Sequence, residues 1–163
     1  MFRIKLCMKR ELGCDSNLFL VFDENSKIKY RVVTKNKRFL KSIFLLDSFG
    51  NNMANIKKFS FPLVSVYFIK IEIFDVAVIE NRVNFKPIYH ISRTDWIFKN
   101  SSKAYYFSVV DQMSEILMTQ YKDVITGEYN IEIFKENFEI PGICISVCVN
   151  NLIINENKVL ELT

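Results

Sequence analysis

The stretch that decides the fold lies near the end of the chain, at residues 140–154, and reads Ile-Pro-Gly-Ile-Cys-Ile-Ser-Val-Cys-Val-Asn-Asn-Leu-Ile-Ile. The β-branched residues over 143–149 favour a strand. Other features favour a helix: Pro141 suits a first helical turn, the run is longer than a typical strand, and its apolar residues do not alternate. A helix that is apolar on all sides has to be buried on all sides. Local sequence leaves the two states open.

The segments before this stretch are predicted to be short strands separated by turns. Each places β-branched or aromatic residues in an alternating or short apolar pattern, over 2–8, 17–22, 28–34, 39–46, 53–61, 64–71, 73–81, 83–92, 104–110, 115–122 and 129–134. The segment 115–122 also has some helical character, and Asp95-Trp96 lies between two strands. Residues 158–163 alternate in the same way and are predicted as a last strand. Pro87 indicates a strand at an edge or a bulge. About ten to twelve strands at this spacing are typical of an antiparallel sandwich or a closed barrel.

Three aspartates occupy the same position in three of these strand pairs. Asp23, Asp47 and Asp111 each follow an apolar residue at the end of a strand, and a few turn residues separate each of them from the next apolar segment. A carboxylate in this position accepts hydrogen bonds from backbone N–H groups of the turn. We therefore expect three hairpins of one plan, in which Asp23 and Glu24 are turn residues and not a catalytic acid–base pair.

Length and composition predict a single domain over residues 1–163. Half of the 163 residues are hydrophobic, with 15 Phe and 7 Tyr, which is typical of a globular chain and not of a disordered one. No apolar run reaches the roughly 18 residues that a membrane-spanning helix needs, so we do not expect a transmembrane protein. Residues 1–11 interleave basic and apolar residues without the apolar core of a secretory signal, which predicts a cytoplasmic location.

Reactive side chains are few and form no recognisable catalytic motif. The four cysteines lack a Cys-x-x-Cys pair and His90 is the single histidine, so a Cys/His zinc site is not expected. On a helix, Cys144 and Cys148 would share a face, as in a metal or redox pair, but two small buried apolar residues are the better interpretation. An enzyme would need a polar pocket around His90. We predict no catalytic residue, no metal and no cofactor.

Several short motifs follow one another in a recognisable order. They are Phe22-Asp23-Glu24-Asn25, Leu46-Asp47 through Gly50-Asn51 with Ala54 and Ile56-Lys57-Lys58, Asp95-Trp96, Val110-Asp111 and the terminal apolar run. Over residues 2–157 their order and spacing resemble the LURP-one-related family, which belongs to the tubby C-terminal-like superfamily. No single motif carries the resemblance, and this chain is poorer in Gly at its turns than the family pattern.

The resemblance implies a mainly β fold, in which an antiparallel β-barrel of about twelve strands closes around a central hydrophobic C-terminal helix over residues 140–154. It favours the helix for the terminal run, against propensity. Asn150 and Asn151 interrupt this run, which suits a barrel interior better than a bilayer. Asp95-Trp96 is expected to pack one end of the barrel. The helix side chains expected in the core are Ile143, Ile145, Val147, Cys148, Val149 and Leu152.

Charge is distributed unevenly along the chain. Residues 1–60 hold thirteen Lys or Arg against five Asp or Glu, and residues 61–163 hold nine against thirteen. Seven of the basic residues lie between positions 27 and 41, and alternation along a strand would place several of them on one face. Such a face attracts anionic head groups or phosphates, although lysines can also protect a strand edge. The candidate anion-binding residues are Lys27, Lys29, Arg31, Lys35, Lys37, Arg38 and Lys41.

The resemblance and the charge together indicate a binding module and not an enzyme. Proteins that resemble this fold bind phosphoinositide head groups or act as phospholipid scramblases, but the phosphoinositide-binding residues of tubby have no matching positions here. A barrel filled by its own helix leaves only its outer surface for binding. We predict binding of anionic phospholipid head groups or a phosphorylated ligand, peripherally at a membrane. The alternative is a protein–protein interaction module; nucleic acid is not expected, because the aromatics fall at core positions.

Overall fold

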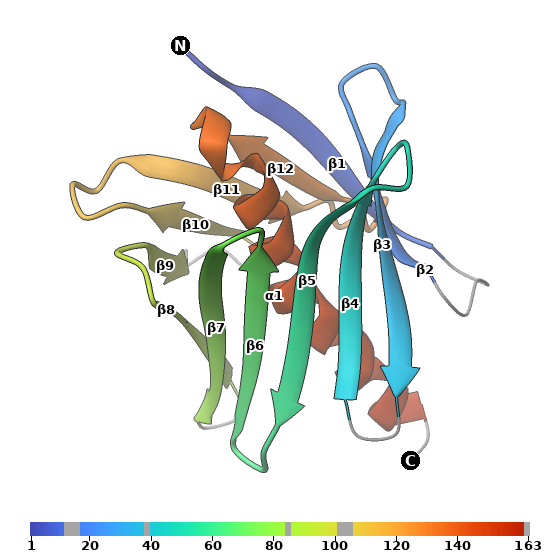
Figure 1. Cartoon of the computed structure of the whole chain (residues 1–163). Coiled ribbons are helices and arrows are strands. Elements are labelled where there is room, and N and C mark those ends of the chain that lie inside the picture. The colour runs from blue at the N-terminus through green and yellow to red at the C-terminus, as the bar shows by residue number, and fades with distance from the viewer. Residues whose placement is uncertain (12–16, 38–39, 84–85, 101–105, 162–163) are drawn as a thin grey trace.

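A single curled sheet surrounds one long helix in this protein (Figure 1). The computed structural model describes residues 1–11, 17–37, 40–83, 86–100 and 106–161, and the side chains of these residues except 17, 36–37, 40, 83, 86 and 151–161. Within these residues twelve strands pair in the order β8-β7-β6-β5-β4-β3-β2-β1-β12-β11-β10-β9, and every pair is antiparallel. The strands are β1 (Ile4–Arg10), β2 (Asn17–Phe22), β3 (Ile28–Lys37), β4 (Leu40–Asp47), β5 (Asn52–Ser60), β6 (Val64–Ile71), β7 (Phe74–Val83), β8 (Lys86–Ser92), β9 (Ile97–Asn100), β10 (Tyr106–Val110), β11 (Ile116–Lys122) and β12 (Tyr129–Ile133). The predicted barrel around a C-terminal helix is confirmed.

The barrel closes between β8 and β9 through aromatic side chains. These strands are the two ends of the sheet, and no backbone ladder joins them within the described residues. Tyr89 of β8 packs on Phe98 of β9 with ring centroids 5.2 Å apart, and Phe98 stacks on Phe107 of β10 at 4.7 Å. The Tyr89 hydroxyl also donates a hydrogen bond to the carbonyl oxygen of Val149, at 3.4 Å. Pro87 lies in β8, so its predicted edge position is confirmed.

The helix runs through the middle of this barrel. A short 3-10 turn, η1 (Glu136–Phe138), leads into α1 (Glu139–Glu161). Every side chain from residue 141 to residue 150 is buried. The helix predicted for 140–154 is therefore confirmed, but its predicted end is wrong. The strand predicted over 158–163 is wrong for residues 158–161, which continue α1, and residues 162–163 lie outside the described residues.

Backbone hydrogen bonding explains why β-branched residues form a helix here. A buried N–H or C=O group without a partner costs free energy, so nearly all of them are paired. The backbone groups of the barrel strands pair with one another along the sheet. A chain at the barrel axis therefore finds no backbone hydrogen-bonding partner in them. Only a helix satisfies its backbone within its own segment. This requirement outweighs a β-propensity whose full range is about 1 kcal/mol.

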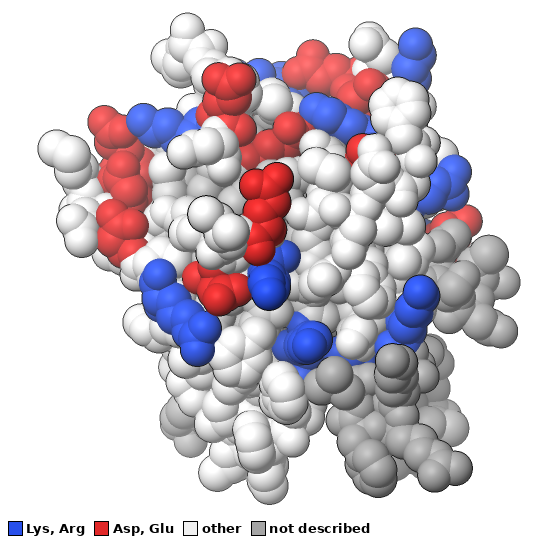
Figure 2. All heavy atoms as spheres, viewed as in Figure 1, with Lys and Arg blue, Asp and Glu red and all other residues white. Residues whose placement is uncertain are grey.

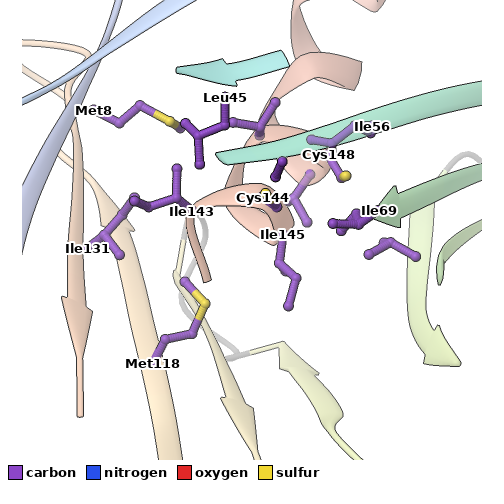
Figure 3. Close-up of a cluster of buried hydrophobic side chains, with 14 of the residues drawn as sticks. Met8, Leu45, Ile56, Ile69, Met118, Ile131, Ile143, Cys144, Ile145 and Cys148 are labelled. Atoms are coloured by element: carbon purple, nitrogen blue, oxygen red, sulfur yellow. The ribbon is translucent and has the colours of Figure 1, made fainter. Parts of the chain in front are cut away.

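Side chains from around the barrel pack against α1. Figure 3 shows Ile143, Ile145 and Cys148 of the helix enclosed by residues of the surrounding strands. These helix residues, with Val147 and Val149, are buried as predicted, whereas the side chain of Leu152 lies outside the described residues. The strand residues labelled around them are Met8, Leu45, Ile56, Ile69, Met118 and Ile131.

Two details set how α1 sits in the barrel. At Gly142 a Cβ atom would lie 2.7 Å from Cδ1 of Ile133, so glycine allows the helix to approach β12 closely. Further along, the amides of Asn150 and Gln120 form two reciprocal hydrogen bonds, at 3.0 and 3.3 Å, although both residues are buried. The polar residue that interrupts the apolar run therefore has its partner on β11.

The three predicted aspartate hairpins are confirmed and share one geometry. Asp23, Asp47 and Asp111 each accept, on one carboxylate oxygen, the backbone N–H groups two and four residues ahead. The residue three positions after each aspartate has a positive φ: Ser26 at 60°, Gly50 at 84° and Ser114 at 63°. Desolvation alone would raise the pKa of the Asp47 carboxyl group. Hydrogen bonds from Asn51, Phe49 and Gly50 outweigh it and hold this pKa below its usual value.

Candidate functional site

The basic residues predicted to form one surface are divided among different parts of the barrel. Arg31 and Lys35 are exposed on the outer face of β3, and Lys27 is exposed in the turn before that strand. Lys41 shares a face of β4 with the buried Ile43 and therefore points toward the barrel interior. The structure does not describe Arg38 or the side chain of Lys37.

Lys29 has a structural partner. Its ammonium forms an ion pair with the carboxylate of Glu139, the first residue of α1, and this pair ties β3 to the start of the helix. Burial and the nearby charge of Glu139 also raise the pKa of the neighbouring Tyr30 phenol far above its usual value. Lys29 therefore has a carboxylate partner at the start of α1.

Three cations do lie together across the outer face of the sheet, and we name them the basic row: Lys35, Lys57 and Arg93. Lys35 is in register with Ser42, and Ser42 with Lys57, which places the two lysines about two strand spacings, or roughly 10 Å, apart. Both lysines are exposed. Lys57 is in turn in register with Phe68 of β6.

Aromatic rings hold two of these cations against the sheet. The Lys35 ammonium lies 5.5 Å from the ring centroid of Phe44, and the Arg93 guanidinium lies 5.4 Å from that of Phe68. Such cation–π contacts keep a long side chain on the surface while its charge stays accessible. Sequence reasoning missed Lys57 and Arg93. The alternation around Ala54 and Ile56 could have placed Lys57 outward, but only the fold brings Arg93 beside Phe68.

An apolar surface adjoins the basic row, at the end of the barrel formed by the β5–β6 hairpin. It consists of the exposed side chains of Phe59, Phe61, Leu63 and Ile88. Phe59 is in register with Val66 and Val66 with Ile79, both half-buried, so the patch is continuous across three strands. In Figure 2 the described side chains in the lower part of this face carry no charge, and Lys and Arg side chains, with Asp or Glu side chains among them, lie above.

A groove of about 970 Å³ opens at the other end of the barrel, where α1 begins. Aromatic side chains form its floor: Trp96 lies 5.5 Å from Phe74 and 4.7 Å from Phe138, measured between ring centroids. The predicted packing of Trp96 at one end of the barrel is thus confirmed. The charged residues that line the groove are Glu72, Asp95, Asp111, Glu136, Glu139, Lys70 and Lys135.

A second group of charges faces the barrel interior near the β5–β6 hairpin. Glu80 is fully buried on β7, and the Arg82 Nε atom lies 3.2 Å from its carboxylate. Lys58 of β5 is half-buried beside them, and desolvation lowers the pKa of its ammonium. The Lys58 ammonium also lies 5.5 Å from the ring centroid of Tyr67. Since Lys58 points inward, it does not extend the basic row.

The three described thiols have raised pKa values and are protonated at neutral pH. Burial raises the pKa of Cys144 to about 12 and that of Cys148 well above the usual thiol value. At Cys7, partial burial and a hydrogen bond donated to Glu128 raise the pKa to about 11. A protonated thiol is a poor nucleophile and a poor metal ligand. The predicted burial of Cys144 and Cys148 is confirmed, and Cys14 lies outside the described residues.

Other predicted features lie on the surface. His90 is exposed on the outer face of β8, in register with Ile79, and does not line the groove. Within the described part of the chain, no cluster of three or more His, Cys, Asp or Glu side chains could hold a metal ion. Among those same residues, no helix has the length and apolar character that a membrane crossing requires.

Comparison with known proteins supports the fold. No protein-family model matches the chain, and no curated protein matches it in sequence. Among solved structures it is similar to the X-ray structure of a protein from Arabidopsis thaliana, with a TM-score of 0.60 and 14% identity over 92% of each chain. At this identity the similarity concerns the fold alone. Membership of the LURP-one-related family therefore stays a prediction.

Proposed function

We propose that this chain is a non-enzymatic module that binds anionic phospholipid surfaces through the basic row, and that it belongs to the LURP-one-related family. The observation that carries the binding proposal is the position of Lys35, Lys57 and Arg93, which lie on one outer face at the border of an uncharged surface. Arg31 adds a further exposed cation on β3. The protein would act in the cytoplasm, peripherally at the membrane.

The expected electrostatic free energy of binding is that of a reversible interaction. Each Lys or Arg near an anionic membrane contributes about 1 kcal/mol, so the basic row contributes about 3 kcal/mol, or roughly a hundredfold in affinity. This attraction falls off within a Debye length and weakens as salt rises. Adjacent head groups in a bilayer present several anionic charges at once, which a single free phosphate does not. We therefore favour the lipid surface over a soluble phosphorylated ligand.

Co-sedimentation with vesicles tests this proposal. The chain should bind vesicles of phosphatidylcholine with phosphatidylserine, and bind vesicles of phosphatidylcholine alone far more weakly, at low ionic strength. Neutralising the basic row (Lys35→Gln, Lys57→Gln and Arg93→Gln) should reduce binding about a hundredfold. A matched variant that loses the same charge elsewhere (Lys5→Gln, Lys27→Gln and Lys99→Gln) should retain most of it. Equal binding to both vesicle types at low salt would refute the proposal.

The groove favours a second candidate function, a protein-interaction module. Its volume is within the usual range for ligand sites, its floor is aromatic, and its charged lining has five carboxylates against two lysines. A basic peptide with one apolar anchor would complement it. Such a peptide should change the fluorescence of Trp96, the single Trp, and Asp95→Asn should weaken the change. Neutralising Lys35 and Lys57 should leave it unaffected.

A further inference from the structure

We infer that the tip of the β5–β6 hairpin inserts into the interfacial layer of the bilayer, with Phe61 and Leu63 as the inserted side chains. This inference rests on the proposed function, because it needs the chain to meet an anionic membrane. It adds a distinct physical element, which is apolar burial at a defined point of the fold. The basic row would bring the barrel to the surface, and the hairpin tip would hold it there.

The first observation is the exposure of large apolar side chains at this tip. Phe61 and Leu63 are 62% and 69% exposed, and they flank Pro62 in the turn. Phe59 and Ile88, at 40% and 51%, extend the apolar surface onto the strands beside the turn. Large clustered apolar surfaces on a soluble chain mark sites of contact with a partner or a membrane.

The second observation is that backbone hydrogen bonds hold the tip in place. The N–H of Phe61 donates to the carbonyl oxygen of Val64 at 2.8 Å and closes the turn. The N–H of Arg82 on β7 donates to the carbonyl oxygen of Leu63 at 3.1 Å and ties the turn to the next strand. The apolar side chains are therefore presented by a shaped hairpin, which lowers the entropy lost on insertion.

The third observation is the distance between the tip and the basic row. Phe61 follows Lys57 by four residues along β5 and its end, which corresponds to about 13 Å in an extended strand. Interfacial segments bury their apolar face roughly 5–10 Å into the boundary between head groups and acyl chains. With the Lys57 ammonium at the head-group phosphates, Phe61 therefore reaches the start of the acyl region. The tip thus extends about 13 Å beyond Lys57, which exceeds the 5–10 Å to which such segments are usually buried and so suffices to reach that depth.

Charge and shape favour a bilayer over a protein as the occupant. The apolar side chains lie on the projecting β5–β6 turn, and the uncharged area around it is bordered on one side by a region that contains several Lys and Arg side chains. The opposite end of the barrel offers an internal contrast. Phe49 and Ile73 are 88% and 100% exposed there, but they lie in turns beside Asp47 and Glu72 and not beside the basic row. An anionic surface would attract the first end and not the second.

Fluorescence measures insertion directly. In a Trp96→Phe background, Phe61→Trp places a single reporter at the tip, and Phe49→Trp places the same reporter at the opposite end. On vesicles of phosphatidylcholine with phosphatidylserine, the Phe61→Trp emission should shift to the blue and be quenched by lipids brominated in their acyl chains. The Phe49→Trp emission should do neither. An unshifted, unquenched Phe61→Trp reporter on vesicles that bind the chain would overturn the inference.

Co-sedimentation separates this inference from the proposed function. Phe61→Ser with Leu63→Ser should reduce binding at physiological salt roughly tenfold or more, because it removes two buried apolar side chains, while Phe49→Ser should not. Because both substituted residues are exposed, this variant should retain the melting temperature of the unaltered chain. If the unaltered chain ignores anionic vesicles, both ideas fail. If it binds them and the tip variant binds equally well, insertion is refuted and the basic row alone accounts for binding.

Discussion

Two apolar regions of this chain meet opposite environments. The helix segment around Ile145 is enclosed by the barrel, with no side chain from residue 141 to residue 150 exposed. The β5–β6 hairpin tip, with Phe61 and Leu63, is largely exposed to water. Both regions carry large apolar side chains, and the fold decides which of them are buried. The apolar side chains of the core stabilise the fold, whereas those of the tip stay exposed to solvent.

The same substitution in the two regions should have the largest difference in effect. Ile145→Asp places a carboxylate among apolar side chains and should cost more than about 4 kcal/mol, enough to prevent stable folding. Phe61→Asp should change the free energy of unfolding by no more than about 0.5 kcal/mol. Circular dichroism during thermal unfolding measures both. A soluble Ile145→Asp variant with an unchanged melting temperature would contradict the buried central helix.

Buried and exposed amide pairs extend this comparison to polar residues. Asn150→Leu leaves the buried Gln120 amide without its partner and should cost about 1–3 kcal/mol, whereas replacing both residues by apolar ones should recover part of the loss. The exposed pair of Asn52 and Asn55 is joined by a hydrogen bond of 2.6 Å, and Asn52→Leu should cost less than about 0.5 kcal/mol. Urea unfolding compares them. Equal costs at both sites would show that the interior pair is open to water.

Gly142→Ala tests how closely the helix approaches the barrel wall. Helix propensity alone predicts a gain of about 1 kcal/mol for this change. The contact with Cδ1 of Ile133 predicts the opposite sign, a loss of about 1–3 kcal/mol from overpacking. Ile133→Val removes the clashing methyl group, so Gly142→Ala should cost much less in that background. A stabilised Gly142→Ala variant would mean that the helix is less tightly held than the structure indicates.

The smallest effect is expected at the aspartate hairpins. Ser26 and Ser114 have positive φ angles that disfavour residues with a Cβ atom, while the equivalent residue of the third hairpin is Gly50. Ser26→Gly and Ser114→Gly should each raise the free energy of unfolding by about 0.5 kcal/mol, after the entropy that glycine adds to the unfolded chain. Ser48→Gly, in the Gly50 hairpin but without a positive φ, is the matched control and should not stabilise.

Sequence patterns predicted the strands better than the candidate site. Period-two alternation reports which residues face inward, so β2 and β6 have the predicted boundaries and the aspartate turns were recognised. The basic row was only partly predicted, with Lys35 alone among its three members. Which cations belong to the basic row depends on the register of β3, β4, β5 and β6. It also depends on the turn after β8, which places Arg93 over Phe68. No local pattern contains that information.

The final residues of the chain show the same limit. The Val and Leu alternation after residue 158 suggested a strand, but the backbone continues α1 to Glu161. Alternation over six residues is too short to separate the two states when a helix already leads into it. The resemblance to a known family was needed to favour the helix at residues 140–154, because propensity argued against it.

By itself the sequence determined that this is a β-rich chain with turns at defined aspartates and one apolar run that had to be buried. Those properties follow from local alternation, turn chemistry and hydrophobicity. The tertiary structure decided that the run is a helix, because the strands pair only with one another and leave the axis of the barrel without hydrogen-bonding partners. It also decided which cations share a face and which apolar side chains stay in water. These are consequences of strand register and barrel closure, which join residues that are distant along the chain.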